Sequence, residues 1–371
     1  MREKATTLKR QNQSVDLWLL ISTLMLVAIG LVAIYDASVI SAFRDFSDRF
    51  YYFKNQLAWA ALGTIALMFF SFLNYHKILK LAPIIFLLSI FSLILVLVPH
   101  VGSEVLGARR WIEIAGFTFQ PSEFAKLAII FYATSTIAKF ENFKINLFDA
   151  ILVYFLPILV PISLVIFQPD LGTALIFMAI AIVIYFMGNA PIWHFLTFAP
   201  LVLFGAIIAI VTKPYRLERL KAFLDPTYDP QGASYHINQI IIALASGGLL
   251  GVGLGGSRSK FEFIPEVHND AIFAVIVEEL GFLGAVVLIS IFLFLIIRAL
   301  TVAKGAGDFQ GKLLASGLAS LIAIQILFNL ASIVALVPLT GIPLPFISYG
   351  GSSLFVTMAA IGILTNIKRQ S

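Results

Sequence analysis

Long apolar runs separated by short polar segments dominate the sequence. A run of about 17 to 25 apolar residues is long enough to cross the hydrocarbon core of a bilayer as a helix. The chain has such runs at 17–35, 56–73, 79–98, 122–138, 148–167, 171–188, 192–212, 271–297, 313–337 and 352–367. The pattern predicts an all-α polytopic membrane protein with about ten transmembrane helices, in a single domain that covers residues 1–371.

The composition agrees with this prediction. Of the 371 residues, 60% are hydrophobic and only 12% are charged, and the mean hydropathy is +0.97. So much apolar surface cannot be buried in one water-soluble core. The first run, 17–35, is longer than the apolar core of a signal peptide and lacks a convincing cleavage site behind it. We therefore expect it to remain as a membrane span.

The composition also argues against several kinds of site. Without cysteine the chain has no disulfide and no thiolate zinc site, and its five histidines include no close pair at helical metal spacing. The formal net charge of +5 is small, and membrane topology explains it better than nucleic-acid binding, which would need a basic stripe on a soluble face. We expect no nucleic-acid partner.

Lysine and arginine are distributed unevenly among the loops. Membrane proteins concentrate these residues in their short cytoplasmic loops. One side of the predicted bundle carries most of them: Arg2, Lys4, Lys9, Arg10, Lys77, Lys80, Lys139, Lys144, Arg298, Lys304, Lys312, Lys368 and Arg369. We therefore expect both termini in the cytoplasm and a long extracytoplasmic loop, 213–270, between the seventh and eighth spans.

The most informative polar stretch ends this long loop. Glu266, His268 and Asp270 alternate with Val267 and Asn269, so in an extended segment the three ionisable side chains share one face. That face lies at the entry of an apolar span, on the expected outer side of the membrane. Because Asp270 directly precedes the span, a helix N-cap is its simpler interpretation, and a functional carboxylate is the alternative.

Two pairs of ionisable residues lie inside or at the edge of apolar runs. Glu123 and Lys126 are three residues apart, follow a predicted N-cap at Ser122, and can form an ion pair on one helical face. Glu278 and Glu279 lie within the run 271–297 and need partners or a cavity there. Ionisable residues near hydrocarbon are costly, so each pair needs a reason to be there. That reason is either structural or functional.

Four basic residues outside the spans are candidates for binding phosphate. Arg109 and Arg110 lie in an external loop, and guanidinium is the side-chain group best suited to phosphate. Arg216 and Lys221 lie in 215–224, where leucine and phenylalanine alternate with charged residues at helical spacing, as in an amphipathic interfacial helix. The simpler interpretation of Arg109 and Arg110 is that they anchor the chain to lipid headgroups.

Three turn motifs lie on the predicted outer side. Asp170 directly precedes a span, which predicts an N-cap. Ser352 lies in a Gly-Ser segment, where it either caps the last span or faces an anion together with backbone N–H groups. Residues 251–256 match G-x-G-x-x-G, but no strand–helix–strand unit surrounds them, so we reject dinucleotide binding. We expect 240–250 to form a short membrane-inserted segment that turns at these glycines.

Taken in order, these motifs resemble the SEDS family of cell-wall polymerases, which includes FtsW of cell division and RodA of elongation. The resemblance rests on G-A-R-R-W-I from Gly107, F-Q-P-S-E-F-A-K from Phe119, Q-P-D-L-G-T from Gln168, R-L-K-A-F-L-D-P from Arg219, S-G-G-L-L-G-V-G-L-G from Ser246, I-P-E-V-H-N-D from Ile264, E-E-L-G from Glu278 and P-L-P-F-I-S-Y-G-G-S-S from Pro343. It covers nearly the whole chain, and residues 257–261 and Asn269 favour FtsW over RodA.

The resemblance implies a peptidoglycan glycosyltransferase that polymerises lipid II, an undecaprenyl pyrophosphate-linked disaccharide-pentapeptide, at the outer face of the bacterial cytoplasmic membrane. The essential acidic residue of the family falls on Asp270. Its membrane Glu and Lys, which couple site and partner, fall on Glu123 and Lys126. The resemblance also implies a protein partner, a class B penicillin-binding protein, which is a transpeptidase that cross-links the strands. Membrane lipids surround the chain as further partners.

Such a transfer needs a base for the acceptor hydroxyl and positive charge for the departing pyrophosphate. We assign Asp270 as that base, or as ligand of a divalent cation, Mg²⁺ or Mn²⁺, shared with the pyrophosphate. The residues assigned to substrate binding are Arg109, Arg110, Arg216, Lys221, His268 and Ser352. Two other functions stay open: a lipid II flippase, because about ten helices with proline-broken spans also suit alternating access, and a division scaffold that only recruits partners.

Overall fold

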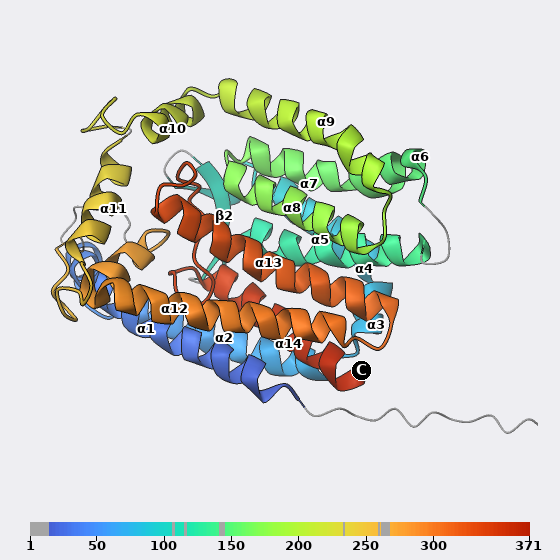
Figure 1. The fold of residues 1–371 in the computed structure, drawn as a ribbon, viewed down its shortest axis with the longest axis horizontal. Coiled ribbons are helices and arrows are strands. Elements are labelled where there is room, and N and C mark those ends of the chain that lie inside the picture. Colours follow the sequence, from blue (N-terminus) through green and yellow to red (C-terminus); the bar gives the residue numbers. More distant parts are fainter. Residues whose placement is uncertain are drawn as a thin grey trace, which may run out of the picture.

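The computed structural model describes residues 15–105, 108–114, 117–140, 145–232, 234–258, 260 and 268–371, and it shows a bundle of long helices (Figure 1). The long helices are α1 (Leu17–Phe46), α2 (Tyr51–Phe72), α4 (Ala82–Leu95), α5 (Pro121–Ile137), α7 (Leu156–Phe167), α8 (Leu171–Met187), α9 (Ile192–Val211), α12 (Ile272–Lys304), α13 (Phe309–Ile333) and α14 (Gly351–Gln370). Shorter helical elements join or extend them: α3 (Tyr75–Lys80), η1 (Ala138–Phe140), α6 (Leu147–Asp149), η2 (Ala150–Phe155), α10 (Pro214–Leu224) and α11 (Tyr235–Ser246).

Every predicted apolar run coincides with a helix, which confirms the helical membrane bundle. Among the described residues, seven helices are long and apolar enough to cross a membrane: α1, α2, the continuous helix Leu147–Phe167, α9, α12, α13 and α14. The other runs form the shorter helices α4, α5 and α8, of 14, 17 and 17 residues. Before Pro157 and Pro161 the chain forms the π-helical segment η2.

The helices differ in how far they lie inside the bundle. In the apolar part of α14, 83% of the residues are buried, and in α13 67%, whereas in α9 the share is 11%. α14 packs against α2, and α13 packs against α12, α8 and α5. α13 and α14 therefore form the centre of the bundle, and α9 runs along its outer edge (Figure 1).

The segment 99–121, expected as an external loop, contains a small antiparallel sheet. Its strands β1 (Gly102–Val105), β2 (Ala108–Ile114) and β3 (Phe117–Phe119) pair in the order β1–β2–β3. Ser103 lies opposite Trp111, and its hydroxyl donates to the Trp111 carbonyl at 3.2 Å. Because β3 leads into α5 through Gln120, the sheet fixes the entry of that helix.

The segment 213–270 is partly helical. α10 confirms that 215–224 forms a helix. α11 begins at Tyr235 and ends at Ser246, so the helix lies earlier than the inserted segment expected at 240–250. The glycine-rich stretch 247–256 follows α11 and forms no regular structure. α11 packs against α12 and carries this stretch to the side of that helix.

The glycine-rich stretch pairs with a break in α12. At Gly281, φ is 67° and ψ is −170°, a conformation that interrupts the helix and favours glycine. The Val252 and Gly253 amides donate to the Glu278 and Glu279 carbonyls, each at 3.0 Å. Two amides beyond the break donate in the other direction, Phe282 to the Gly248 carbonyl at 2.9 Å and Leu283 to the Leu249 carbonyl at 3.2 Å. Two carbonyls before the break and two amides after it are thus hydrogen-bonded, as burial away from water requires.

Candidate active site

The polar motifs gather at one end of the bundle, which we call the loop end. It is formed by the start of α12, the loop 334–350 before α14, the small sheet and the turn 168–170 before α8 (Figure 1). The opposite end, the terminal end, contains Ser371, which lies beside Gly307 in the α12–α13 turn. There Arg298 forms an ion pair with Asp16 at 2.5 Å, so α1 also begins at the terminal end.

Asp270 lies at the loop end, directly before α12. Its side chain is partly exposed and has no hydrogen bond or ion pair with the described part of the chain. Asn329 Nδ2 fixes its backbone by donating to the carbonyls of Asp270 and Ile342, each at 2.8 Å. The N-cap interpretation is wrong, because α12 begins at Ile272 with Ala271 in the cap position and no side-chain cap. Asn329 therefore fixes the backbone of Asp270, whose carboxylate has no partner among the described residues.

His268 supports the loop that carries Asp270. Its ring is buried, with centroids 4.3 Å from Tyr52 and 5.6 Å from Tyr349, and its carbonyl accepts from the Tyr349 amide at 2.9 Å. Burial lowers the pKa of His268 to about 4, so the imidazole is neutral near pH 7. This packing favours a structural role, and the substrate contact stays a prediction. Glu266, the third member of the predicted face, lies outside the described residues.

Ser352 lies in the first turn of α14 and joins that helix to the sheet. Its hydroxyl accepts from the Gln120 amide at 3.0 Å and donates to the Thr118 carbonyl at 3.3 Å. The capping interpretation is wrong, because Gly350 is in the cap position and no side chain caps α14. The hydroxyl is used inside the protein, so a substrate contact by Ser352 stays a prediction.

Arg110 joins the sheet to the turn before α8. Its Nε donates to the Gln168 carbonyl at 3.0 Å and one Nη donates to the Pro169 carbonyl, while the other Nη lies 4.0 Å from an Asp170 carboxylate oxygen. Asp170 accepts from the amide and the hydroxyl of Thr173 at 3.0 and 2.9 Å, which confirms the predicted cap of α8. The guanidinium of Arg110 therefore holds backbone at the edge of the site.

The other predicted phosphate ligands differ in their surroundings. Arg216 is buried and donates to backbone carbonyls of α9 and α7 at 2.7 and 3.2 Å, so it fastens α10 to the bundle. Lys221 is exposed on α10, with its ammonium 5.3 Å from the centroid of the Tyr228 ring. Arg109 lies half-buried on β2. For Arg216 a contact with substrate would require these backbone bonds to break, so the structure favours a structural role.

Glu123 and Lys126 form the predicted pair in the first turns of α5. Their charged atoms are 2.6 Å apart, at angles outside those of a hydrogen bond, and their side chains are 4% and 1% exposed. The pairing is confirmed. The expected N-cap at Ser122 is wrong, because Gln120 is in the cap position and the Ser122 hydroxyl has no partner in the described chain. A pair so deeply buried is costly to form and more costly to break.

Glu278 and Glu279 find partners in the segment that follows the glycine-rich stretch. Ser257 Oγ donates to Glu278 at 2.5 Å. Lys260 Nζ lies 3.1 Å from Glu279 and 3.0 Å from Asp36 of α1. Lys260 and both glutamates are buried, so the network links α1, α12 and the loop that leads to Asp270.

Asn329 is the residue of the site that the sequence analysis missed. It lies in α13, is completely buried, and binds the two carbonyls that position Asp270 and the loop before α14. The available signal was an amide side chain inside the apolar run 313–337, because a buried polar group needs partners. Which backbone it would meet depends on tertiary packing.

The described residues contain no group of three or more histidine, aspartate or glutamate side chains that could hold a metal ion. Among the described residues, Asp270 is the predicted site residue that supplies carboxylate oxygens. Mg²⁺ usually keeps few protein ligands and shares the phosphates of its substrate. The donors present therefore fit a cation held jointly with a substrate phosphate, and they do not fit a cage built by the protein.

The fold and the site together define a multi-pass membrane protein with its polar site at one end of the bundle. Residues 17–371 match the model of the FtsW, RodA and SpoVE family, described as cell cycle protein. The chain belongs to this family, which confirms the resemblance found in the sequence.

Relatives over nearly the full length carry division and sporulation names. The chain is 39% identical over 365 residues to the Stage V sporulation protein E of Bacillus subtilis, covering 97% of this chain and 99% of the relative. It is 38% identical over 358 residues to the probable peptidoglycan glycosyltransferase FtsW of Geobacter sp. strain M18, covering 96% and 98%.

Solved structures show the same fold. A chain of a peptidoglycan synthase complex, described for the structural coordination of polymerization and crosslinking, matches with a TM-score of 0.79 and 30% identity, over 96% of this chain and 98% of that chain. The rod shape determining protein RodA of Thermus thermophilus matches with a TM-score of 0.71 and 28% identity, over 96% and 97%.

Proposed function

We propose that this chain is a peptidoglycan glycosyltransferase that polymerises lipid II into glycan strands at the outer face of the cytoplasmic membrane. The observation that carries the proposal is the Asp270 carboxylate, which is partly exposed and has no partner in the described chain, on a backbone held by Asn329. The names of the FtsW relatives and the solved peptidoglycan synthase complex support this activity.

In the proposed reaction Asp270 is the general base. It takes the proton of the acceptor sugar hydroxyl while the hydroxyl oxygen attacks the anomeric carbon of the donor. The bond between that carbon and the pyrophosphate oxygen breaks, and its electron pair leaves with the pyrophosphate. Because the displacement is direct, the anomeric carbon is inverted and no covalent glycosyl-enzyme forms.

The departing pyrophosphate needs positive charge. We assign Arg109 on β2 and Lys221 on α10 to it. Arg110 and Arg216, whose donors bind backbone carbonyls, shape the surroundings. A divalent cation, Mg²⁺ or Mn²⁺, shared by Asp270 and the pyrophosphate would add charge at the leaving group.

The proposed topology puts the loop end outside the cytoplasmic membrane and both termini in the cytoplasm. The excess of lysine and arginine in the short loops of the terminal end supports this orientation. As partner we propose a class B penicillin-binding protein, supported by the likeness to a complex that coordinates polymerization and crosslinking. We propose a role in division, as for FtsW, with elongation as the alternative.

The experiment uses the purified full-length chain in detergent with lipid II, alone and with the class B penicillin-binding protein of the same organism. We expect glycan strands from the wild type and none from Asp270→Asn, at an unchanged melting temperature. Strands from the variant at wild-type rate would refute the assignment of the base. Lipid II translocation across sealed vesicles without polymer would instead establish a flippase, and neither activity would leave a scaffold.

A further inference from the structure

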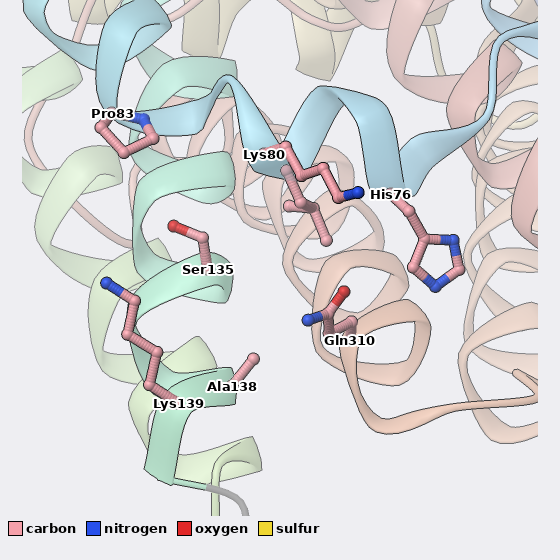
Figure 2. A pocket seen from close by; sticks show the side chains of 8 residues that line it. His76, Lys80, Pro83, Ser135, Ala138, Lys139 and Gln310 are labelled. Atoms are coloured by element: carbon pink, nitrogen blue, oxygen red, sulfur yellow. The ribbon is translucent and has the colours of Figure 1, made fainter.

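A cavity of about 640 Å³ opens at the terminal end, away from Asp270 (Figure 2). Its walls come from α3, the start of α4, the end of α5 with η1, and the first turn of α13. Cavities of roughly 300 to 1,000 Å³ are the usual size for small ligands. The proposed polymerisation makes no use of this one.

Two lysines give the cavity a positive charge. Lys80 extends from α3 toward His76 and Gln310, and Lys139 lies on the other side, beside Ser135 (Figure 2). Neither ammonium has an ion pair or hydrogen bond with the residues that the structure describes, and no lining residue is acidic. Two cations at one cavity, with no ionic partner among the described residues, favour an anionic ligand.

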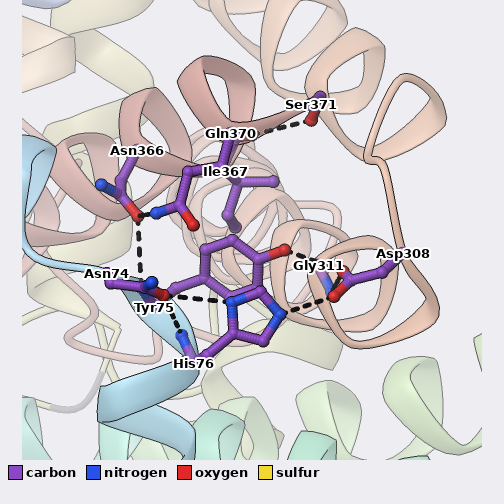
Figure 3. A network of polar contacts seen from close by, with 9 residues as sticks. All are labelled: Asn74, Tyr75, His76, Asp308, Gly311, Asn366, Ile367, Gln370 and Ser371. Carbon is purple, nitrogen blue, oxygen red and sulfur yellow. Dashed lines mark hydrogen bonds and ion pairs between the residues drawn. The ribbon is translucent and has the colours of Figure 1, made fainter. Parts of the chain in front are cut away.

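A hydrogen-bonded network holds the His76 wall in place (Figure 3). His76 Nδ1 lies 3.0 Å from Asn74 Oδ1, and Nε2 lies 2.6 Å from an Asp308 oxygen. The Tyr75 hydroxyl donates to the other Asp308 oxygen at 2.8 Å, and the Tyr75 amide donates to Asn366 at 3.2 Å. The Asp308 carboxylate is thus used within the network, and α3, which carries Lys80, is fixed to α13 and α14.

The cavity also has an apolar part that adjoins a lipid-facing surface. Leu79 and Pro83 line it, and next to them α4 exposes Ile84, Leu87 and Leu88 by more than half. On an apolar helix at the surface of a membrane protein, such side chains are suited to contact acyl chains. A ligand with an anionic head and apolar tails matches both parts, whereas a soluble phosphate would leave the apolar part unused.

We propose that this cavity binds the phosphate of an anionic phospholipid. The headgroup phosphate lies between Lys80 and Lys139, and the acyl chains follow the exposed face of α4. Basic pockets between transmembrane helices are known to recognise anionic headgroups in this way. The lipid belongs to the leaflet at the terminal end, so the site is separate from the one that contains Asp270.

The test measures lipid retention by native mass spectrometry on the purified full-length chain, with phosphatidylglycerol or phosphatidylcholine added. The wild type is expected to retain phosphatidylglycerol about tenfold better, and Lys80→Gln/Lys139→Gln to lose that preference. Lys304→Gln/Lys312→Gln removes the same charge from the same end, outside the cavity, and is expected to behave as the wild type. Lys80→Arg/Lys139→Arg keeps both charges and is expected to retain phosphatidylglycerol as the wild type does.

Three results would overturn the proposal. The first is equal retention of the two lipids by the wild type, and the second is equal losses in the two glutamine variants. The third comes from inorganic phosphate as a third probe. If phosphate displaces phosphatidylglycerol at an ionic strength at which chloride does not, the cavity binds a soluble phosphate and the lipid assignment fails.

Discussion

Asp308 and Asp270, at opposite ends of the bundle, differ in how their carboxylates are used. At the terminal end, Asp308 caps α13 through the Gly311 amide at 2.7 Å and also binds Tyr75 and His76. Burial alone would raise the pKa of Asp308, but these hydrogen bonds outweigh it and keep the pKa below its usual range. At the loop end, Asp270 has its backbone fixed and its carboxylate without a partner in the described chain. The difference separates a carboxylate that holds the fold from one that we propose as the catalytic base.

The sharpest test of this comparison is the same substitution at each end. Asp270→Asn removes the proposed base, so polymerisation of lipid II is expected to fall about 10³-fold with little change in stability. Asp308→Asn weakens hydrogen bonds to a charged acceptor and is expected to lower stability by about 2 kcal/mol with polymerisation unchanged. Strand synthesis on gels and thermal melts in detergent measure both. The comparison fails if the two variants exchange these effects.

The buried carboxylate of Glu123 in α5 is a third case, because it forms an ion pair with Lys126. Lys126→Met leaves Glu123 charged and unpaired, and it is expected to cost about 4 kcal/mol of stability. The double variant Glu123→Gln/Lys126→Met removes both charges and is expected to recover most of the loss. Melting temperatures of the three proteins test this. Equal destabilisation by the single and the double variant would show that the ion pair itself contributes little.

A substitution of Asn329 tests whether catalysis depends on the fixed backbone of Asp270. Asn329→Leu leaves the carbonyls of Asp270 and Ile342 unpaired, and it is expected to cost about 3 kcal/mol and to lower kcat more than it raises KM. Gln325→Leu, one turn earlier in α13, is the control, because the buried Gln325 Nε2 has no partner in the described chain. If both variants lower kcat equally, Asn329 has no special positioning role.

The buried His268 at the loop end is expected to make the stability of the protein depend on pH. Its pKa is about 4 in the folded chain and about 6.5 when unfolded, so below pH 6.5 the unfolded state binds the proton first. Stability is therefore complete above pH 6.5 and is lost toward pH 4, by about 2 kcal/mol between pH 7 and pH 5. Melts of the wild type against His268→Phe isolate this contribution. A pH dependence that is the same in both proteins would contradict it.

The sequence predicted the bundle because span length and hydropathy act locally, one helix at a time. It also predicted the pair Glu123–Lys126 and the cap at Asp170, since both need only neighbours a few residues away. The cap expected from Asp270 was a local prediction too, and it was wrong because Ala271 takes the cap position. Spacing could not show that Asn329, from a distant span, holds that backbone.

The roles of the arginines illustrate a second limit. A guanidinium in a loop suits phosphate, but it suits several backbone carbonyls equally well. Arg110 and Arg216 bind carbonyls of segments far away in sequence. The three-stranded sheet was missed because its strands are only a few residues long and their polar and aromatic residues lack a clear alternation. Contacts across the fold, absent from any sequence window, decide these cases.

The break at Gly281 sets the height of the loop end above the membrane. A helix of the 33 residues of α12 measures roughly 50 Å, whereas the hydrocarbon core is about 30 Å thick. The part after the break, 282–304, is roughly 35 Å long and is sufficient to cross the core alone. Glu278 and Glu279 then lie near the level of the lipid headgroups, and Asp270 lies at most roughly 15 Å farther out. In the proposed reaction, the glycine break thereby keeps the Asp270 carboxylate close to the headgroup layer, where the pyrophosphate of a membrane-anchored substrate meets water.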